Sequence, residues 1–308
     1  MRCWFQTPSD HPGPLYVILP YFNHCGFRRR RDLFLEFVER YKDEPLVRLV
    51  VVEALGPARL GCIKGVWNHL TFRSKNAVWL KENLINLGVE SLPRSWKYMA
   101  WVDADLEFLN QNWVRSTIFE LQDADVVQMW RSAINLGPNG ETIKTDRSFA
   151  YMFVGSGTQW TPTDKYGFWH PGYAWACTRS AYDRMGGLIE WAILGSGDRH
   201  MAMAFAGLAH QSCPGTVHEN YKCLLHIFES RVKDFKVSWV DGTIVHYWHG
   251  SFADRRYRER WDILTRNEYD PIVDIECTRE GVVQLSKQGQ RFEKFLDEYF
   301  VGRREDAV

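Results

Sequence analysis

Apolar runs in the first half of the chain alternate with segments in which apolar residues recur at helical spacing. Four runs predict buried strands, at residues 15–20, 46–55, 97–108 and 125–130. Helices are predicted between them, at 28–42 and 75–88. This order predicts an α/β fold whose mostly parallel, twisted sheet is flanked by helices. Ligands of such doubly wound sheets bind at the carboxyl ends of the strands.

The second half of the chain has a less regular pattern. Residues 131–170 are rich in Gly, Pro, Thr and aromatic residues without a sustained period, which predicts a long, partly irregular insertion. The pattern then predicts a strand at 235–240 and helices at 178–187, 197–208, 253–267 and 284–300. Since no linker separates these parts, we expect one catalytic domain over residues 1–268 and a helical C-terminal extension over 269–308.

Composition narrows the class of protein. The 308 residues carry 38 Lys and Arg against 38 Asp and Glu, and 45% of them are hydrophobic, which excludes a disordered or low-complexity chain. Zero net charge argues against binding nucleic acid by bulk charge. The seven cysteines include no C-x-x-C, so we expect free thiols. No signal peptide or membrane-spanning run is found, so we expect a soluble, cytoplasmic protein.

Two carboxylates follow the third apolar run, in the segment Trp101-Val-Asp-Ala-Asp105. Alternation along a strand directs Asp103 and Asp105 to the same side, at the strand end where a ligand binds. Carboxylates are hard oxygen ligands suited to Mg²⁺ or Mn²⁺, and such a metal can bridge the phosphates of a nucleotide. A solvated turn after the strand is the alternative interpretation.

His246 and His249 lie three residues apart after a strand-like segment. Imidazole binds Mn²⁺ and other transition metals, so one of them can complete a site begun by Asp105. Histidines near aromatic residues are also common as core or surface groups. Asp198 ends a Gly-rich segment at a predicted helix start, where it can act as a general base toward a hydroxyl group or simply as a helix N-cap.

Taken together, these motifs resemble the layout of GT-A-fold glycosyltransferases, in particular β-1,4-galactosyltransferases and polypeptide N-acetylgalactosaminyltransferases. The resemblance spans roughly residues 15–265. It rests on the order of Ile18-Leu-Pro20, Val50-Val-Val-Glu53, the Asp103–Asp105 pair, the Gly-rich block that ends at Asp198, and His246-x-x-His249. Trp79–Gly88 is also similar to the family's F-N-R-x-x-L-L-N-x-G segment, with Lys81 in place of Arg.

The resemblance implies a role for each matching residue. It implies a nucleotide-binding half over about 15–130, with Pro20, Tyr21, Asn23, Glu53 and Lys81 around the nucleotide, and an acceptor-binding half over about 131–268. Asp103 would face the ribose or the metal, and Asp105 and His249 would ligate the metal. His246 would take the place of a methionine ligand of the galactosyltransferases, and Asp198 would deprotonate the acceptor.

The reaction implied is transfer of a sugar from a nucleotide-sugar donor, with a UDP-sugar favoured, to a hydroxyl group. Mn²⁺ or Mg²⁺ would neutralise the diphosphate, and a single displacement would invert the anomeric carbon. Arg255 and Arg256 would reach the diphosphate or the backbone of a nucleic acid, unless they only cover a solvated helix face. Flat surfaces for the sugar or the acceptor would come from Trp160, Trp169, Tyr173 and Trp175.

Departures from the family leave alternatives open. The galactosyltransferases carry G-G-E-D-D-D where this chain has G-S-G-D-R-H. The membrane anchor and disulfides of the Golgi members are not found, and their absence favours a bacterial or viral protein. A glycan or surface polymer is the favoured acceptor, and a hydroxymethylated pyrimidine in viral DNA is the second, given the arginines at 28–31. A catalytically silent sugar- or nucleotide-binding module and a nucleotidyltransferase, which would need further carboxylates, are the other interpretations.

Overall fold

The computed structural model describes residues 13–155 and 169–307. A seven-stranded sheet has the order β10-β6-β9-β4-β1-β2-β3. Its strands are Leu15–Phe22 (β1), Val47–Leu55 (β2), Asn68–Arg73 (β3), Tyr98–Val102 (β4), Val126–Gln128 (β6), Ala174–Thr178 (β9) and Val237–Trp239 (β10). β9 is antiparallel to both of its neighbours, and every other pair in the sheet is parallel. The predicted mostly parallel sheet is therefore confirmed.

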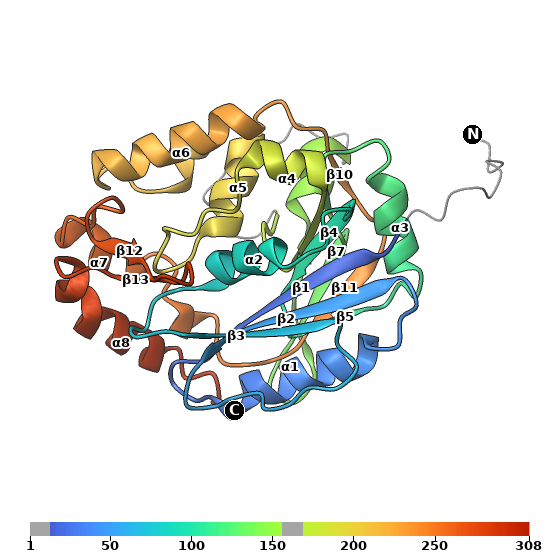
Figure 1. Ribbon diagram of the computed structural model, residues 1–308, viewed down its shortest axis with the longest axis horizontal. Helices are drawn as coiled ribbons and strands as arrows, with labels where there is room; N and C mark the ends of the chain where they lie inside the picture. Colours follow the sequence, from blue (N-terminus) through green and yellow to red (C-terminus); the bar gives the residue numbers. More distant parts are fainter. Residues whose placement is uncertain (1–12, 156–168, 308) are drawn as a thin grey trace.

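Helices cover both faces of this sheet (Figure 1). Leu15, Val17 and Leu19 of β1 belong to one apolar cluster, which includes residues of α1 (Arg28–Tyr41) and α3 (Trp113–Glu120). Their neighbours Tyr16 and Ile18 belong to the other cluster. That second cluster takes in α2 (Lys81–Glu90), α4 (Arg179–Met185), α5 (Gly197–Phe205) and α6 (Glu219–Val232). The near-continuous apolar runs of the sequence thus reflect strands buried on both faces.

A second sheet of four strands has the order β5-β11-β7-β8. Its strands are Leu106–Phe108 (β5), Ser132–Leu136 (β7), Thr142–Arg147 (β8) and Thr243–His246 (β11). The chain passes from β4 of the first sheet into β5 of the second through Asp103, Ala104 and Asp105. The backbone N–H of Tyr247, just after β11, donates to the Asp105 carbonyl at 2.9 Å. The two predicted carboxylates therefore lie where the two sheets meet.

The C-terminal region packs against the second apolar cluster. It contains α7 (Arg260–Arg266), the antiparallel strands β12 (Ile275–Cys277) and β13 (Val283–Leu285), and α8 (Glu293–Gly302). Val283, Phe292 and Leu296 are buried in the same cluster as Ile18 of the central strand. The C-terminal region therefore contains a helix, α8, as predicted, and also two short strands that were not predicted. The proposed boundary at residue 268 stays a prediction.

Three predicted helices begin later than expected. The helix predicted at 284–300 begins at Glu293, because β13 and a 3-10 turn at Gly289–Phe292 take up the residues before it. The helix predicted at 75–88 begins at Lys81, because the residues before it make tertiary hydrogen bonds: the N–H of Trp79 donates to Ile193 O at 2.9 Å. The helix predicted at 253–267 is reduced to a 3-10 turn at Ala253–Arg255 and to α7. Arg256 between them has φ +44°, a left-handed conformation that ends a helix.

Several elements were not predicted. β3, β9, α3 and α6 lie in segments for which no element was expected, and the insertion predicted as irregular contains the paired strands β7 and β8. No described helix is long and apolar enough to cross a membrane. Among the described cysteines none forms a disulfide, and Cys62, Cys223 and Cys277 are exposed.

The C-terminal tail caps the first helix. Phe27, at the N-cap position of α1, provides no side-chain hydrogen bond. Instead, the backbone N–H groups of Arg28 and Arg29 donate to the two carboxylate oxygens of Asp306 at 3.0 and 2.8 Å. A carboxylate at this position satisfies two free N–H groups and interacts favourably with the helix dipole. The C-terminal tail is therefore joined to the N-terminus of α1.

Replacing Asp306 by Ala should lower the free energy of unfolding by about 1 kcal/mol, the usual cost of losing an N-cap side chain. Asp306→Asn should lose less, because an amide oxygen still accepts one hydrogen bond. Urea denaturation of the full chain measures both values. Glu298→Ala is the control, since Glu298 only meets Lys294 at 4.0 Å on the surface. If Asp306→Ala and the control are equally stable, the capping role is wrong.

Candidate functional site

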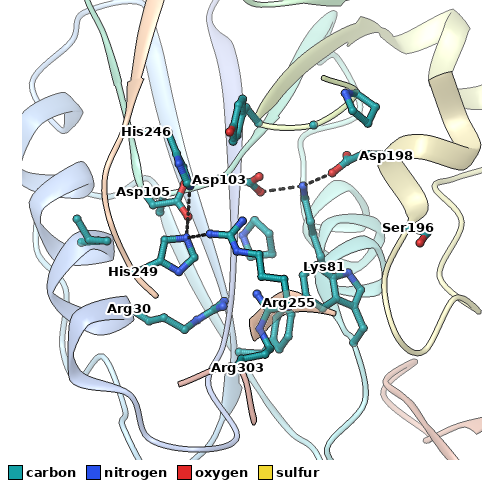
Figure 2. Close-up of a pocket in the computed structure, with 18 of the residues that line it drawn as sticks. Arg30, Lys81, Asp103, Asp105, Ser196, Asp198, His246, His249, Arg255 and Arg303 are labelled. Carbon is teal, nitrogen blue, oxygen red and sulfur yellow. Dashed lines mark hydrogen bonds and ion pairs between the residues drawn. The ribbon is translucent and has the colours of Figure 1, made fainter. Parts of the chain in front are cut away.

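A cleft opens where β1, β4 and β11 end, as the fold class predicts. Asp103, Asp105, His246, His249 and Asp198 all line it, so side chains from three separate segments of the sequence meet at one site. In Figure 2, Asp105, His246 and His249 lie on one side of the cleft, and Asp198 and Ser196 lie on the other. Lys81 and Asp103 lie between the two groups.

Asp105, His246 and His249 form a cluster able to hold a metal ion. Their ligand atoms all lie within 4.8 Å of one another, and Asp105 Oδ2 lies 2.9 Å from His249 Nε2 and 3.8 Å from His246 Nε2. Asp105 Oδ1 and the Nδ1 atoms of both histidines are buried without a hydrogen-bond partner. Since buried polar atoms are rarely left unsatisfied, this cluster fits a cation.

The charge states of the cluster suit metal binding. Burial raises the pKa of Asp105, but the adjacent His246 and His249 outweigh it and hold the pKa well below its usual range. Burial also lowers the pKa of His246 well below its usual value, which keeps that ring neutral. Carboxylate oxygens and imidazole nitrogens are metal ligands, and the presence of two nitrogen ligands favours Mn²⁺ over Mg²⁺.

Lys81 connects the two sides of the cleft. Its ammonium lies 2.7 Å from Asp103 Oδ1 and 2.9 Å from Asp198 Oδ2. Burial acts to lower the pKa of Lys81, but Asp103 and Asp198 raise it well above its usual value, so the side chain stays charged. Burial raises the pKa of Asp103 to about 6, against the lowering effect of Lys81. Asp103 therefore pairs with Lys81 and does not belong to the three-residue metal cluster.

Asp198 is held by a turn that depends on glycine. It lies in the first turn of α5, after Gly195 and Ser196 at φ +84° and +86°. A Cβ atom on Gly197 would lie 2.2 Å from Oε1 of the buried Glu82, and a Cβ on Gly172 would lie 3.0 Å from Asp198 Oδ2. The Gly-rich segment thus allows close packing around the carboxylate. Burial, with Asp198 nearby, raises the pKa of Glu82 to about 8.

Arginines contribute the positive charge of the cleft. Arg30, Arg255, Arg260 and Arg303 line it, and Arg255 NH2 lies 2.8 Å from His249 Nε2. Arg256, predicted beside Arg255, has its guanidinium close to Gly302 and is not among the lining residues of the cleft.

Three of the four arginines at 28–31 contact other groups of the protein through their side chains. Arg29 Nε donates to Trp248 O and Arg31 Nε donates to Arg59 O, while Arg30 pairs with Glu305 at 2.9 Å. This run therefore does not form the open basic stripe that made a DNA acceptor attractive.

The predicted nucleotide pocket is only partly formed by the expected residues. Pro20 and Tyr21 line the cleft. Asn23 does not: its amide group bonds the Tyr21 hydroxyl and both the N–H and the carbonyl of Phe27, which fixes the entry into α1. Glu53 is also absent from the lining, because its carboxylate bonds the N–H of Leu60 and the ring of His69.

Of the four aromatic residues expected to face a sugar, Tyr173 alone is found in the lining of the cleft within the described ranges. Trp169 packs edge-on against Phe149 and is 6% exposed, and Trp175 is fully buried in the apolar core. Both are in the core because they flank or belong to β9, which lies between β4 and β6. Trp160 lies outside the described residues.

The sequence prediction missed the contribution of the C-terminal tail. Arg303 lines the cleft, and Glu305, 2% exposed, pairs with Arg303 and Arg30. Burial raises the pKa of Glu305, but Arg30 and Arg303 hold it well below its usual range. In the sequence the segment Arg303-Arg-Glu-Asp306 has the pattern of a solvated polar tail, so no local signal marked it.

The chain is similar to solved structures of low sequence identity. No protein-family model and no curated protein matches the chain. The catalytic domain of Drosophila β1,4-galactosyltransferase 7 is 13% identical over 92% of this chain and 99% of its own, with a TM-score of 0.42. The mannosyltransferase PcManGT from Pyrobaculum calidifontis is 15% identical over 87% of this chain and 65% of its own, with a TM-score of 0.47. The first is a β1,4-galactosyltransferase, one of the enzyme groups that the order of motifs resembles.

Glu305 faces the second nitrogen of the metal-site histidine. Its Oε2 lies 3.8 Å from His249 Nδ1. Nε2 of the same ring contacts both Arg255 NH2 at 2.8 Å and Asp105 Oδ2 at 2.9 Å. With a metal bound at Nε2, the ring proton would lie on Nδ1, toward Glu305. A carboxylate behind a metal-ligating histidine orients the ring and raises its basicity.

Glu305→Gln should therefore weaken Mn²⁺ binding about tenfold, the lower end of the usual effect of losing such a carboxylate. Electron paramagnetic resonance of free Mn²⁺ gives the affinity without any need for turnover. Thermal unfolding of the same samples shows whether the variant is folded. Glu298→Gln, on the exposed face of α8, is the matched control. Unchanged Mn²⁺ affinity in folded Glu305→Gln would contradict this role.

Proposed function

We propose that the protein is a metal-dependent glycosyltransferase that moves a sugar from a nucleotide-sugar donor to a hydroxyl acceptor with inversion. The observation that carries this proposal is the arrangement of the cleft. A carboxylate–imidazole cluster suited to Mn²⁺ lies on one side, the carboxylate of Asp198 lies on the other, and several arginines line the same cleft. The other two carboxylates among the described residues of the cleft, Asp103 and Asp198, are both engaged by Lys81, which does not favour the second metal of a nucleotidyltransferase.

The donor diphosphate would bind at the Asp105 side of the cleft. Asp105, His246 and His249 would hold the metal, which when bound neutralises charge that develops on the departing diphosphate. Arg255 has a guanidinium suited to bind phosphate oxygens in a bidentate manner. No described carboxylate forms an ion pair with it, and its contacts are the Tyr257 hydroxyl and His249. Pro20 and Tyr21 would contact the nucleoside, for which we favour uridine.

Asp198 would act as the general base. Lys81 engages its Oδ2 oxygen, so Oδ1 is the atom that accepts the proton of the acceptor hydroxyl. The hydroxyl oxygen then bonds to the anomeric carbon as the bond from that carbon to the phosphate oxygen breaks, and the nucleoside diphosphate leaves. Attack from the Asp198 side, opposite the diphosphate, inverts the anomeric carbon. Lys81 fixes Asp198 in position.

The first test is turnover of nucleotide sugars. Incubation with a panel of UDP- and GDP-sugars and Mn²⁺ should release nucleoside diphosphate, and EDTA should stop the release. Asp105→Ala should lower this activity at least a hundredfold, because it removes the carboxylate of the metal site. Asp254→Ala, whose carboxylate pairs with Arg304 outside the cleft, is the control. Release of pyrophosphate would instead indicate a nucleotidyltransferase, and donor binding without any turnover would indicate a silent binding module.

A second test separates donor binding from proton transfer. Asp198→Asn keeps the size of the side chain but removes the base, so transfer should fall by a factor of about 10² to 10⁴. UDP binding in the presence of Mn²⁺, measured by calorimetry, should stay within a few-fold of the wild type, since the diphosphate side is unchanged. Transfer at the wild-type rate in Asp198→Asn would mean that another group is the base.

A further inference from the structure

A second cavity, of about 470 Å³, adjoins the cleft at its Asp198 side. Ser196, Arg199, Tyr257 and Arg260 line both hollows, so the two are adjacent. The walls of the second cavity come from the start of α5, the segment at 211–216, and the residues from Tyr257 into α7. Its volume lies within the range of about 300–1,000 Å³ that ligand sites usually have.

The lining of this cavity is strongly basic. Arg199, Arg258 and Arg260 contribute three guanidinium groups, with no lysine. Asp262 is the one acid among the lining residues, and its carboxylate is already paired with Arg266 at 2.9 Å. The remaining lining is largely polar, with the side chains of Gln211, Ser212 and Thr216. Guanidinium groups bind phosphate and carboxylate in a bidentate manner, so this lining suits an oxyanion.

Arg260 gives the most direct indication of an anionic ligand. It is 6% exposed, yet its contacts are to a carbonyl, hydroxyl groups and an aromatic ring, those of Leu194, Ser196, Tyr299 and Tyr257. No described carboxylate forms an ion pair with it, in contrast to the buried Arg303, which pairs with Glu305. Buried charges in proteins are normally paired, because an unpaired charge loses its hydration without compensation. An oxyanion in the cavity would supply the missing partner.

The position of the cavity indicates which substrate carries the oxyanion. Arg199 follows Asp198 directly in α5, and Ser196 precedes it by two residues. The metal cluster lies on the opposite side of the cleft (Figure 2). A ligand bound in the second cavity therefore reaches the proposed base from the side away from the donor diphosphate.

We propose that this cavity binds a phosphate or carboxylate group of the acceptor, and so selects an anionic acceptor whose hydroxyl lies at Asp198. The assignment to the acceptor rests on the proposed function, whereas oxyanion binding itself does not. The arginines and Ser196 hold the anionic group, and Tyr257 separates it from Arg255 at the donor side.

Binding of inorganic phosphate to the full chain in EDTA tests the site without the metal and without turnover. Calorimetry should show saturable binding at millimolar phosphate. Arg258→Ala, an exposed change that should leave the protein folded, should weaken the affinity about fivefold, as expected for one charge-assisted contact. Asp262→Asn should strengthen it about twofold to threefold, because it removes the acid of the lining. Lys294→Ala, on the exposed face of α8, should change nothing.

Competition distinguishes the acceptor side from the donor side. Saturating UDP with Mn²⁺ should leave phosphate binding intact, and displacement by UDP would assign Arg260 to the donor diphosphate and overturn the proposal. Unchanged affinity in both Arg258→Ala and Asp262→Asn, or no saturable binding, would also overturn it.

Acetate at equal ionic strength distinguishes the two oxyanions: weaker binding than phosphate indicates a phosphate-bearing acceptor, and equal or tighter binding indicates a carboxylate. If phosphate binds as expected but no nucleotide sugar is turned over, the proposed function fails while the oxyanion site stands.

Discussion

The buried ammonium of Lys81 is the interaction on which the geometry of the cleft depends. It bonds Asp103 at the end of β4 and Asp198 at the start of α5, two elements separated by almost a hundred residues. Removing one partner from a buried ion pair typically costs about 3–5 kcal/mol, because it leaves an uncompensated charge. Here the loss would leave two carboxylates facing each other across the cleft. The separation of Asp103 from Asp198 across the cleft is therefore set by one side chain, that of Lys81.

The neutral composition of the chain conceals a strong local separation of charge. Three carboxylates, those of Asp103, Asp105 and Asp198, line the cleft together with several arginines. Some of these arginines are balanced within the protein, as Arg303 is by Glu305. Arg255 and Arg260 are not paired with a described carboxylate. This difference separates arginines that hold the structure together from arginines that are available to an anionic substrate.

Local sequence patterns identified side chains that the fold brings together in one cleft, and they failed where a side chain's position depends on tertiary packing. Asp105, His249 and Asp198 could be identified because an apolar run or a Gly-rich turn precedes each of them. Trp175 was misjudged because β9 looks like an isolated aromatic segment, although it pairs with β4 and β6 inside the sheet. Glu305 was missed because it is buried by pairing with Arg30, 275 residues away, which leaves no periodic signal.

The C-terminal tail links these features, because it makes the metal side of the cleft depend on the end of the chain. Glu305 faces His249 and Arg30, and Asp306 caps the helix that carries Arg30. Close packing enforces this arrangement: a Cβ atom on Gly250 would lie 3.1 Å from both the Arg304 carbonyl and the Glu305 Cα. A displaced tail would at once expose the buried Nδ1 of His249, free the guanidinium of Arg30 and uncap α1. The metal side of the cleft therefore forms only when the last residues of the described chain are in place.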